Sequence, residues 1–342
     1  MGTDRVVVGA DGVVGGILAR ALDAVRVVHR SPRAGEHANA DAGEVIARAR
    51  VVVNAQGFRP RPGLSALELD DSHGPATAKL IDRMSAGQTL VHVSSAAVLG
   101  TARAGLVSSE WPPAPESFPM PAYALSKWRA ERIAIEQGGA RGLLTLVVRP
   151  AVVFEHPADG MLASLVRLAR TRNIVLCLSP ARARHHFCSA PLLGAVARAL
   201  VTGPPTCSHG DAFTVADPFV VTNAELREQL CRPLARRLHL EVPVPARGAS
   251  ALLARLPRLA ALQGLDVAAL AEVFGVLGMD VRYDTGATFD RLGLEPTDFD
   301  VDRTWLPFVA ATLAEPRSPG AMALGAEEAR EPVSRADRGA PG

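Results

Sequence analysis

Short apolar runs and longer amphipathic segments alternate along the first half of the chain. Five runs rich in β-branched residues predict strands at residues 5–8, 25–29, 51–54, 89–94 and 143–149. Apolar positions at helical spacing predict helices between them, over residues 13–22, 74–84 and 122–137. The unbroken apolar run at 51–53 indicates a strand buried on both faces, as in parallel sheets. The pattern therefore predicts an α/β fold with a Rossmann-type, doubly wound parallel sheet.

Beyond residue 150 this alternation loosens. Helix-like segments at 161–170, 191–201 and 223–240 are mixed with short strands such as 213–215. We expect residues 1–150 to form one domain to which the chain returns around 186–220, and residues 151–315 to form mainly a second, smaller lobe. Residues 316–342 are rich in Pro, Gly, Ala and alternating charge with almost no large apolar groups, which predicts a disordered tail.

Composition narrows the class of protein. The chain of 342 residues is long enough for two lobes, and its 37 basic and 35 acidic residues are too evenly balanced to indicate nucleic acid or an anionic membrane. No apolar run approaches the roughly 18 residues of a membrane span, and the first strand begins too early for a signal peptide. The four cysteines show no metal-ligand spacing. We therefore expect a cytoplasmic protein with reduced, mostly buried thiols and no metal site.

A glycine-rich turn stands where the first predicted strand enters a helix. Gly9, Gly12 and Gly15 form a GxxGxxG motif, which permits a tight turn and the approach of a pyrophosphate to the helix N-terminus. After the second strand, Arg30 and Arg33 could clamp a 2′-phosphate, which favours NADP(H) over NAD(H); solvated loop arginines are the alternative. The predicted cofactor-binding residues are Gly9, Asp11, Gly12, Val13, Val14, Gly15, His29, Arg30, Ser31, Arg33, Asp41, Asn54, Ala55, Gln56, Gly57, Ser94, Lys127, Pro150, Val152 and Val153.

The chain has only two tyrosines and two lysines, yet Tyr123 and Lys127 stand four residues apart. On a helix they share a face, and a nearby cation lowers the pKa of a phenol from its reference of about 10. Such a phenol can protonate a carbonyl oxygen, or accept the proton in the reverse reaction. An exposed aromatic ring beside a solvated lysine is the alternative. Ser95, with Ser94 as the fallback, follows a strand at the sheet edge where it could hydrogen-bond a substrate carbonyl.

The order of these motifs resembles the extended short-chain dehydrogenase/reductase family. The motifs are the glycine turn, Asn54-Ala55-Gln56-Gly57, Ser95-Ala96-Ala97, Tyr123-x-x-x-Lys127 and Arg149-Pro150, and the likeness runs over roughly residues 5–308, loosely in the second half. It implies an NAD(P)-binding Rossmann domain, a C-terminal lobe that closes over a small-molecule substrate, and a homodimer. It also implies that Tyr123 is the acid/base, that Lys127 binds the nicotinamide ribose and lowers the tyrosine pKa, and that Ser95 polarises the carbonyl.

Departures from the family pattern indicate the reaction. Sugar dehydratases carry an Asp-Glu pair after the catalytic hydroxyl residue, where this chain has Ala96 and Ala97. Val152 lies where nucleotide-sugar epimerases commonly have an Asn for the substrate diphosphate. The pattern is most similar to NDP-deoxysugar 4-ketoreductases of antibiotic biosynthesis, which implies NADPH-dependent reduction of a dTDP-linked keto-deoxysugar at C4.

Three alternatives stay open at this point. They are a nucleotide-sugar epimerase with bound NAD, a reductase of a polyketide or cyclitol ketone, and a non-catalytic NADPH-binding regulator, against which the retained Tyr123 and Lys127 argue. The candidate substrate residues are Ser95, Ala96, Tyr123, His156, Arg184 and His186. Arg184 and His186 belong to a basic cluster, 182–186, that could meet a diphosphate or could equally be a solvated loop. We assign His73 and the three tryptophans to surface or packing roles.

Overall fold

The computed structural model describes residues 4–28, 36–37, 42–58, 65–101, 105–108, 111–156, 161–202, 207–236, 239–244 and 275–315. Five predicted cofactor residues, together with the predicted tail 316–342, lie outside the described residues: His29, Arg30, Ser31, Arg33 and Asp41.

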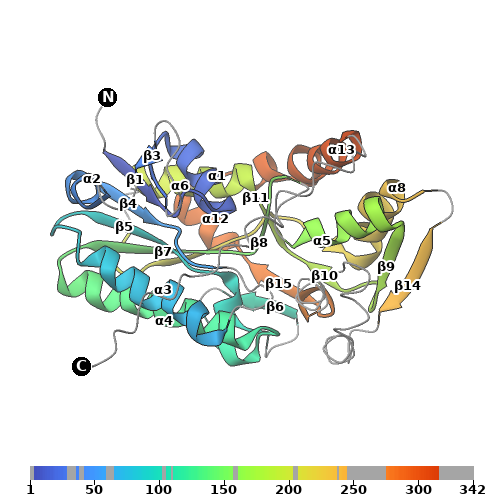
Figure 1. Ribbon diagram of the computed structural model, residues 1–342, viewed down its shortest axis with the longest axis horizontal. Helices are drawn as coiled ribbons and strands as arrows, with labels where there is room; N and C mark the ends of the chain where they lie inside the picture. The colour runs from blue at the N-terminus through green and yellow to red at the C-terminus, as the bar shows by residue number, and fades with distance from the viewer. Residues whose placement is uncertain are drawn as a thin grey trace, which may run out of the picture.

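A seven-stranded parallel sheet forms the larger part of the molecule (Figure 1). Its strands are β1 (Arg5–Val8), β2 (Val25–Val27), β3 (Glu36–His37), β4 (Val51–Asn54), β5 (Thr89–Val93), β7 (Leu144–Pro150) and β12 (Ala212–Val215). They lie in the order β12-β7-β5-β4-β1-β2-β3, and every neighbouring pair is parallel. This arrangement confirms the predicted Rossmann-type fold, and the five strands predicted in the first half lie within two residues of their expected bounds.

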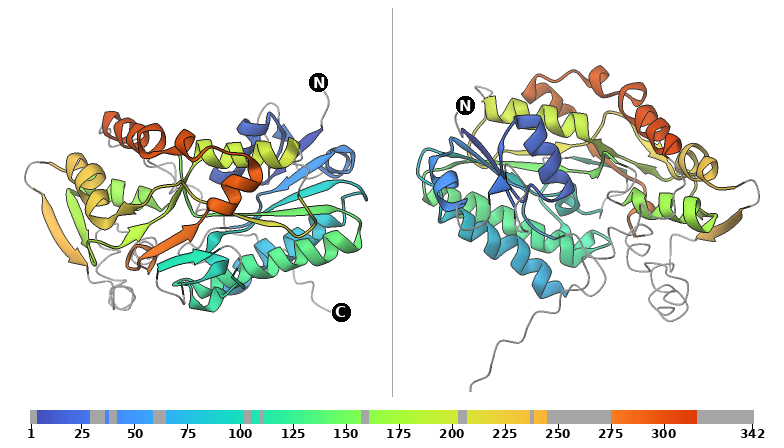
Figure 2. Two further views of the ribbon diagram at one scale, coloured as in Figure 1. Left: turned by 180° about the vertical axis from the view of Figure 1, so that it is seen from behind. Right: turned by 45° about the horizontal axis from the view of Figure 1, so that its top comes forward.

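Helices cover both faces of this sheet (Figure 2). One face carries α1 (Val13–Leu22), α6 (Ala190–Thr202) and α12 (Gly286–Leu292), whereas the other carries α2 (Ala42–Arg48), α3 (Ala66–Ile81) and α4 (Pro121–Ala140). Both α6 and β12 come from the second half of the chain, so the polypeptide returns to the Rossmann sheet after leaving it at β7.

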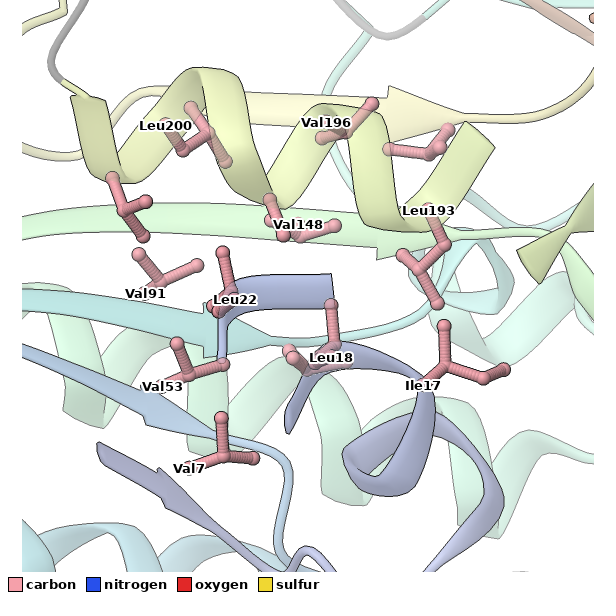
Figure 3. Packing of buried hydrophobic residues seen from close by; sticks show 14 of the residues in the cluster. Val7, Ile17, Leu18, Leu22, Val53, Val91, Val148, Leu193, Val196 and Leu200 are labelled. Atoms are coloured by element: carbon pink, nitrogen blue, oxygen red, sulfur yellow. The ribbon is translucent and has the colours of Figure 1, made fainter. Parts of the chain in front are cut away.

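The two cores of the sheet follow from the alternation of side chains along the strands. Val53, Val91 and Val148, on neighbouring strands, point to the face where Leu18 of α1 and Leu193 of α6 pack (Figure 3). The adjacent positions Val52 and Leu90 belong to the core on the opposite face. Each fully buried Val or Leu stabilises the folded state by about 1.5–3 kcal/mol. Burial on both faces therefore fixes the positions of the strand ends.

Helix α3 begins two turns before the predicted start at residue 74. Ser65 and Glu68 form a capping box: Ser65 Oγ accepts a hydrogen bond from Glu68 N at 3.1 Å, and Glu68 Oε2 accepts one from Ser65 N at 2.8 Å. This reciprocal pair satisfies two free N–H groups at the helix end and fixes the start there. The prediction was wrong because Pro75, inside the helix, masked the helical pattern.

The smaller lobe is built from short strands and helices (Figure 1). Its strands are β6 (Gly105–Ser108), β8 (Val152–Phe154), β9 (Ile174–Leu178), β10 (Arg184–His185), β11 (Phe187–Ser189), β13 (Val221–Thr222), β14 (Leu240–Val244) and β15 (Val281–Asp284). Its helices are α5 (Leu162–Arg167), α7 (Asn223–Glu225), α8 (Arg232–Leu234) and α13 (Leu306–Ala314), with π-helical turns at Leu168–Arg172, Leu226–Cys231 and Val301–Trp305. The predicted helix 223–240 is thus shorter, ending at Leu234, and residues 240–244 form β14.

Four aromatic side chains form the centre of this lobe. Phe154 contacts Phe187, Trp305 and Phe308 edge-on, with ring centroids 5.0–6.3 Å apart. Trp305 Nε1 donates a hydrogen bond to Gln229 Oε1 at 2.7 Å, which satisfies the indole where it is buried. The packing role predicted for Trp305 is therefore confirmed.

All four cysteines are free thiols; Cys188 and Cys231 are buried, and Cys177 and Cys207 are half-buried. Among the described helices, none has the length and apolar character needed to cross a membrane.

Candidate active site

A cavity of about 980 Å³ lies at the carboxyl ends of the central strands and extends to the smaller lobe. Its lining includes Gly9 after β1, Ala55 after β4, Ser94 after β5 and Pro150 at the end of β7. From β1 the chain continues to β2 and β3 on one side of the sheet, and from β4 it continues to β5 and β7 on the other side. The cavity therefore lies at the point where the strand order reverses. Ligands of open α/β folds bind at this position.

The glycine turn is shaped by close backbone contacts. Gly9 has φ +84°, and a Cβ there would lie 2.7 Å from Ala55 O. A Cβ on Gly15 would lie 2.1 Å from Gly9 O, so a side chain at either position would displace the turn. Gly12 caps α1 without a side-chain hydrogen bond to the first turn. These features fit a dinucleotide diphosphate, which would lie against the backbone at the positive end of α1.

Most predicted cofactor residues among those described line this cavity. Besides Gly9, Gly12 and Gly15, they are Asp11, Val13, Val14, Ala55, Gln56, Gly57, Ser94, Lys127, Pro150, Val152 and Val153. Asn54 is not among the lining residues and is only 1% exposed. Its Nδ2 donates to Thr77 Oγ1 at 3.0 Å, and its Oδ1 accepts from Gln56 N at 3.2 Å. Asn54 therefore stabilises the turn after β4 without lining the cavity.

Tyr123 and Lys127 both line the cavity from α4. Lys127 is 8% exposed, and its Nζ donates a hydrogen bond to Val93 O at 3.3 Å. Burial lowers the pKa of Lys127 from 10.5 to about 8, because the charged form loses hydration. The ammonium is therefore still the main form at neutral pH, beside the helix face that carries the phenol.

Ser95 and its fallback Ser94 also line the cavity, where β5 ends. Ser95 caps the 3-10 helix Ala96–Leu99, and its Oγ accepts a hydrogen bond from Ala97 N at 3.2 Å. Ser95 Oγ keeps its own proton for another acceptor. Ser94 Oγ is buried and has no hydrogen-bond partner among the described residues. The Ser95 hydroxyl can therefore donate to an oxygen placed in the cavity.

A buried ion pair ties helix α4 to the sheet. Arg149 Nε lies 3.1 Å from Glu131 Oε2, and Arg149 Nη2 lies 2.5 Å from Glu131 Oε1. Both side chains are less than 10% exposed. This bidentate contact ties the middle of α4 to the end of β7, which carries Pro150 at the cavity.

The substrate candidates of the second lobe divide into two groups. His186 lines the cavity, its Nδ1 accepts from Tyr283 N at 2.8 Å, and burial with the nearby charge of Arg282 lowers its pKa to about 4. Arg184 and His156 do not line the cavity. Arg184 Nη2 instead lies 2.7 Å from Asp280 Oδ2, and His156 Nε2 lies 3.0 Å from Glu315 Oε1, so a carboxylate outside the cavity contacts each side chain.

The sequence did not indicate one residue that contacts Tyr123. His73, assigned above to the surface or to packing, is 2% exposed and meets the Tyr123 ring edge-on, with centroids 5.9 Å apart. The predicted start of the helix at residue 74 placed His73 outside it. The capping box Ser65-x-x-Glu68 was the sequence signal that would have brought His73 onto the helix facing Tyr123.

Comparisons with known proteins agree with this fold. A profile of an NAD-binding family described as male sterility protein matches residues 76–189. No curated protein matches the sequence.

Solved structures with this fold include enzymes that act on nucleotide sugars. UDP-glucuronic acid 4-epimerase from Bacillus cereus, in complex with NAD, is 12% identical with a TM-score of 0.68, covering 93% of this chain and 99% of the epimerase. RMD from Pseudomonas aeruginosa, complexed with NADPH, is 16% identical with a TM-score of 0.63, covering 92% of this chain and all (100%) of RMD. The terminal R domain from the myxalamid PKS-NRPS biosynthetic pathway is 15% identical with a TM-score of 0.64, and covers 90% of each chain.

Fold and site together define the class: the chain has the Rossmann-type fold of NAD(P)-dependent oxidoreductases and epimerases, with a cavity that fits a dinucleotide. The prediction of a nicotinamide-dependent enzyme fold agrees with the family profile and with the structural neighbours.

Proposed function

We propose that this protein is an NADPH-dependent reductase of the extended short-chain dehydrogenase/reductase family, which reduces a ketone to an alcohol. One observation carries the proposal: Tyr123, Lys127 and Ser95 line the same cavity as the glycine turn. A cofactor bound along that turn and a carbonyl substrate would therefore meet beside the phenol.

Each of the three side chains has a separate part in the reaction. When bound, the reduced nicotinamide supplies the hydride. Ser95 donates a hydrogen bond to the carbonyl oxygen, Tyr123 gives that oxygen its proton, and Lys127 stabilises the phenolate that remains. Buried Ala96 and Ala97 follow the serine, so the extra acid and base that a dehydration needs are not at these positions. Reduction of a carbonyl is the reaction that needs only Ser95, Tyr123 and Lys127 together with the cofactor.

Our first candidate substrate is a dTDP-linked deoxysugar with a keto group at C4. The sequence pattern supports it, as do fold neighbours that bind UDP-glucuronic acid or UDP-glucose. We also propose that residues 151–315 mainly bind this substrate and that residues 186–220 return to the NADP-binding domain. The position of β12 in the large sheet supports that return.

An apolar ketone is a second candidate, favoured by one part of the cavity lining. This part consists of large apolar side chains: Phe118, Met120, Met161, Val276, Leu277, Met279 and Val281. Flexible methionines adapt to irregular apolar groups, and His186 is neutral at pH 7 because its pKa is about 4. Such a wall suits a polyketide-like chain better than it suits a diphosphate.

A substrate panel separates these candidates. Purified protein is mixed with NADPH and with either a dTDP-4-keto-6-deoxysugar or an aliphatic ketone, and nicotinamide absorbance is followed. Oxidation with the sugar alone supports the first candidate, and oxidation with the aliphatic ketone alone supports the second. Interconversion of UDP-sugars without net consumption of NADPH would instead identify an epimerase.

Tyr123→Phe tests the mechanism. The variant should lose at least about 100-fold in kcat, because general acid catalysis contributes on the order of 10²–10⁴. NADPH binding should stay close to that of the wild type, since the phenol acts in the transition state. A variant with wild-type kcat would refute the role of Tyr123.

The cofactor preference is tested at Arg30, which lies outside the described residues. We expect Arg30→Ala to weaken NADPH binding by about tenfold or more while NADH binding changes little, because a bidentate contact to the 2′-phosphate is lost. Equal losses for the two cofactors, measured by fluorescence titration, would remove Arg30 from the 2′-phosphate site.

A further inference from the structure

His73 joins two parts of the candidate site that are distant in the sequence. It projects from α3, between the segment 55–58 that lines the cofactor side of the cavity and the first turn of α4 that carries Tyr123. The side chain is 2% exposed and does not line the cavity. His73 therefore contacts other residues of the site and does not contact a ligand in the cavity.

The first contact is with Gly57. Gly57 has φ +117°, and a Cβ on this residue would lie 2.0 Å from Cδ2 and 2.3 Å from Nε2 of His73. The imidazole thus occupies the space in which any other residue would place its side chain. Next to it, Phe58 N donates to Ser72 Oγ at 3.1 Å, so α3 holds this segment at two successive residues.

The second contact is with the first turn of α4. His73 Nδ1 lies 2.9 Å from Ser126 Oγ, and Ser126 Oγ donates to Tyr123 O at 2.8 Å. A hydroxyl has one proton, so while Ser126 donates to Tyr123, His73 Nδ1 carries a proton and donates to Ser126. The turn has no side-chain cap at Met120, and this chain of hydrogen bonds tethers it instead.

The imidazole is neutral in this setting. Burial lowers the pKa of His73 to about 2, and the nearby charge of Lys127 acts in the same direction, against a backbone hydrogen bond with Phe58. His73 therefore adds no charge beside the phenol at working pH. Its effect on the site comes through the position of its neighbours.

We propose that His73 is a positioning residue that fixes the cofactor-side segment 55–58 and the catalytic Tyr123 relative to each other. The inference rests on the proposed function, since it takes Tyr123 as the proton donor. The contact between the imidazole ring and Gly57 fixes the position of segment 55–58. The hydrogen bond from Nδ1 to Ser126 fixes the position of Tyr123.

Two substitutions separate the two contacts. In His73→Asn the side-chain amide retains a donor near the place of Nδ1 but removes the ring from Gly57. In His73→Phe the ring remains and the donor is lost. Leu80→Ala is the control, because Leu80 lies on the same helix, is buried in the sheet core, and touches neither contact.

Two measurements on the full-length protein follow these contacts without a substrate. NADPH affinity is measured by fluorescence titration. The phenol of Tyr123 is titrated by its ultraviolet absorbance; the chain has only one other tyrosine, Tyr283, and burial raises its pKa well above the usual range. Tyr123 therefore accounts for the tyrosine signal that changes up to about pH 11.

We expect a crossed pattern. His73→Asn should weaken NADPH binding by about tenfold and leave the Tyr123 titration in place, whereas His73→Phe should bind NADPH nearly as wild type and shift the Tyr123 midpoint by about half a unit or more, because the surroundings of the phenol change. Leu80→Ala should lower the unfolding temperature alone. If both His73 variants match Leu80→Ala, or if each loses both properties equally, the inference is overturned. If the wild type fails to bind NADPH, the proposed function is refuted. The tyrosine titration of His73→Phe then still tests whether the contact with Ser126 positions Tyr123.

Discussion

Lys127 is a charged residue placed where water is largely excluded. Its ammonium has one hydrogen bond to Val93 O, and burial has moved its pKa to about 8. The other lysine, Lys79, is exposed on α3. The two lysines of the chain thus differ in solvent exposure, and a reagent that modifies amines can distinguish them.

Reduction should lose rate as the pH rises through about 8. Below this value Lys127 is an ammonium that stabilises the phenolate of Tyr123, and above it the charge is lost. The log of kcat/KM for the reductive direction should be flat at pH 6–7 and fall by about one unit per pH unit well above the pKa.

Competitive acetylation followed by peptide mass spectrometry checks the assignment. The Lys127 peptide should titrate near pH 8. A rate that stays constant to pH 9.5 would contradict a role for the Lys127 charge.

At the scale of elements, α4 depends on one buried contact with the sheet. Glu131 is in the middle of the helix, and its carboxylate is held by Arg149 of β7 at two positions. A carboxylate removed from such a pair leaves a guanidinium buried without its counter-charge. The same helix has an exposed pair, Arg132 with Glu136, on the opposite side.

Glu131→Gln should lower the free energy of unfolding by about 3 kcal/mol, because it leaves Arg149 buried and unpaired. Glu136→Gln is the matched control and should change it by less than about 0.5 kcal/mol, since solvent already screens that pair. Urea denaturation of both variants measures the difference. Equal effects would show that the buried pair does not hold α4 to the sheet.

The elements that could be predicted are those whose signal is local. The apolar run 51–54 and the glycine turn specify β4 and the entry to α1 through side-chain periodicity and backbone freedom. The small strands β6 and β15 could not be predicted, because each pairs with a partner more than a hundred residues away and shows little periodicity of its own.

The candidate site divides in the same way. The motifs of Tyr123, Lys127 and Ser95 predicted a shared site, because their order along the chain resembles that of the extended short-chain dehydrogenase/reductase family. The partners of Arg184 and the contacts of His73 depend on side chains brought close only by tertiary packing. For this reason the sequence left the basic cluster at 182–186 either at a diphosphate or in a solvated loop, and in the structure Arg184 pairs with Asp280 outside the cavity whereas His186 lines it.

For the whole molecule, bound NADPH should increase stability. A ligand that binds only the folded state at 100 times its Kd adds about 2.7 kcal/mol. Thermal unfolding with and without NADPH measures this effect. Gly15→Ala should remove the response, because a Cβ at 2.1 Å from Gly9 O displaces the turn that receives the diphosphate. Gly43→Ala, a helical position with free space around it, should keep the response. A wild-type response in Gly15→Ala would place the cofactor elsewhere.

The order of strands in the large sheet also bears on how the protein is made. β7 lies between β5 and β12, and nearly all of it is buried in the finished fold. During translation β7 leaves the ribosome well before β12, and at about 5–20 residues per second the segment between them takes on the order of seconds to synthesise. Through that interval the nascent sheet presents an unpaired apolar edge, the kind of surface that chaperones bind and that drives aggregation. A fragment ending after β7 would keep that edge unpaired permanently.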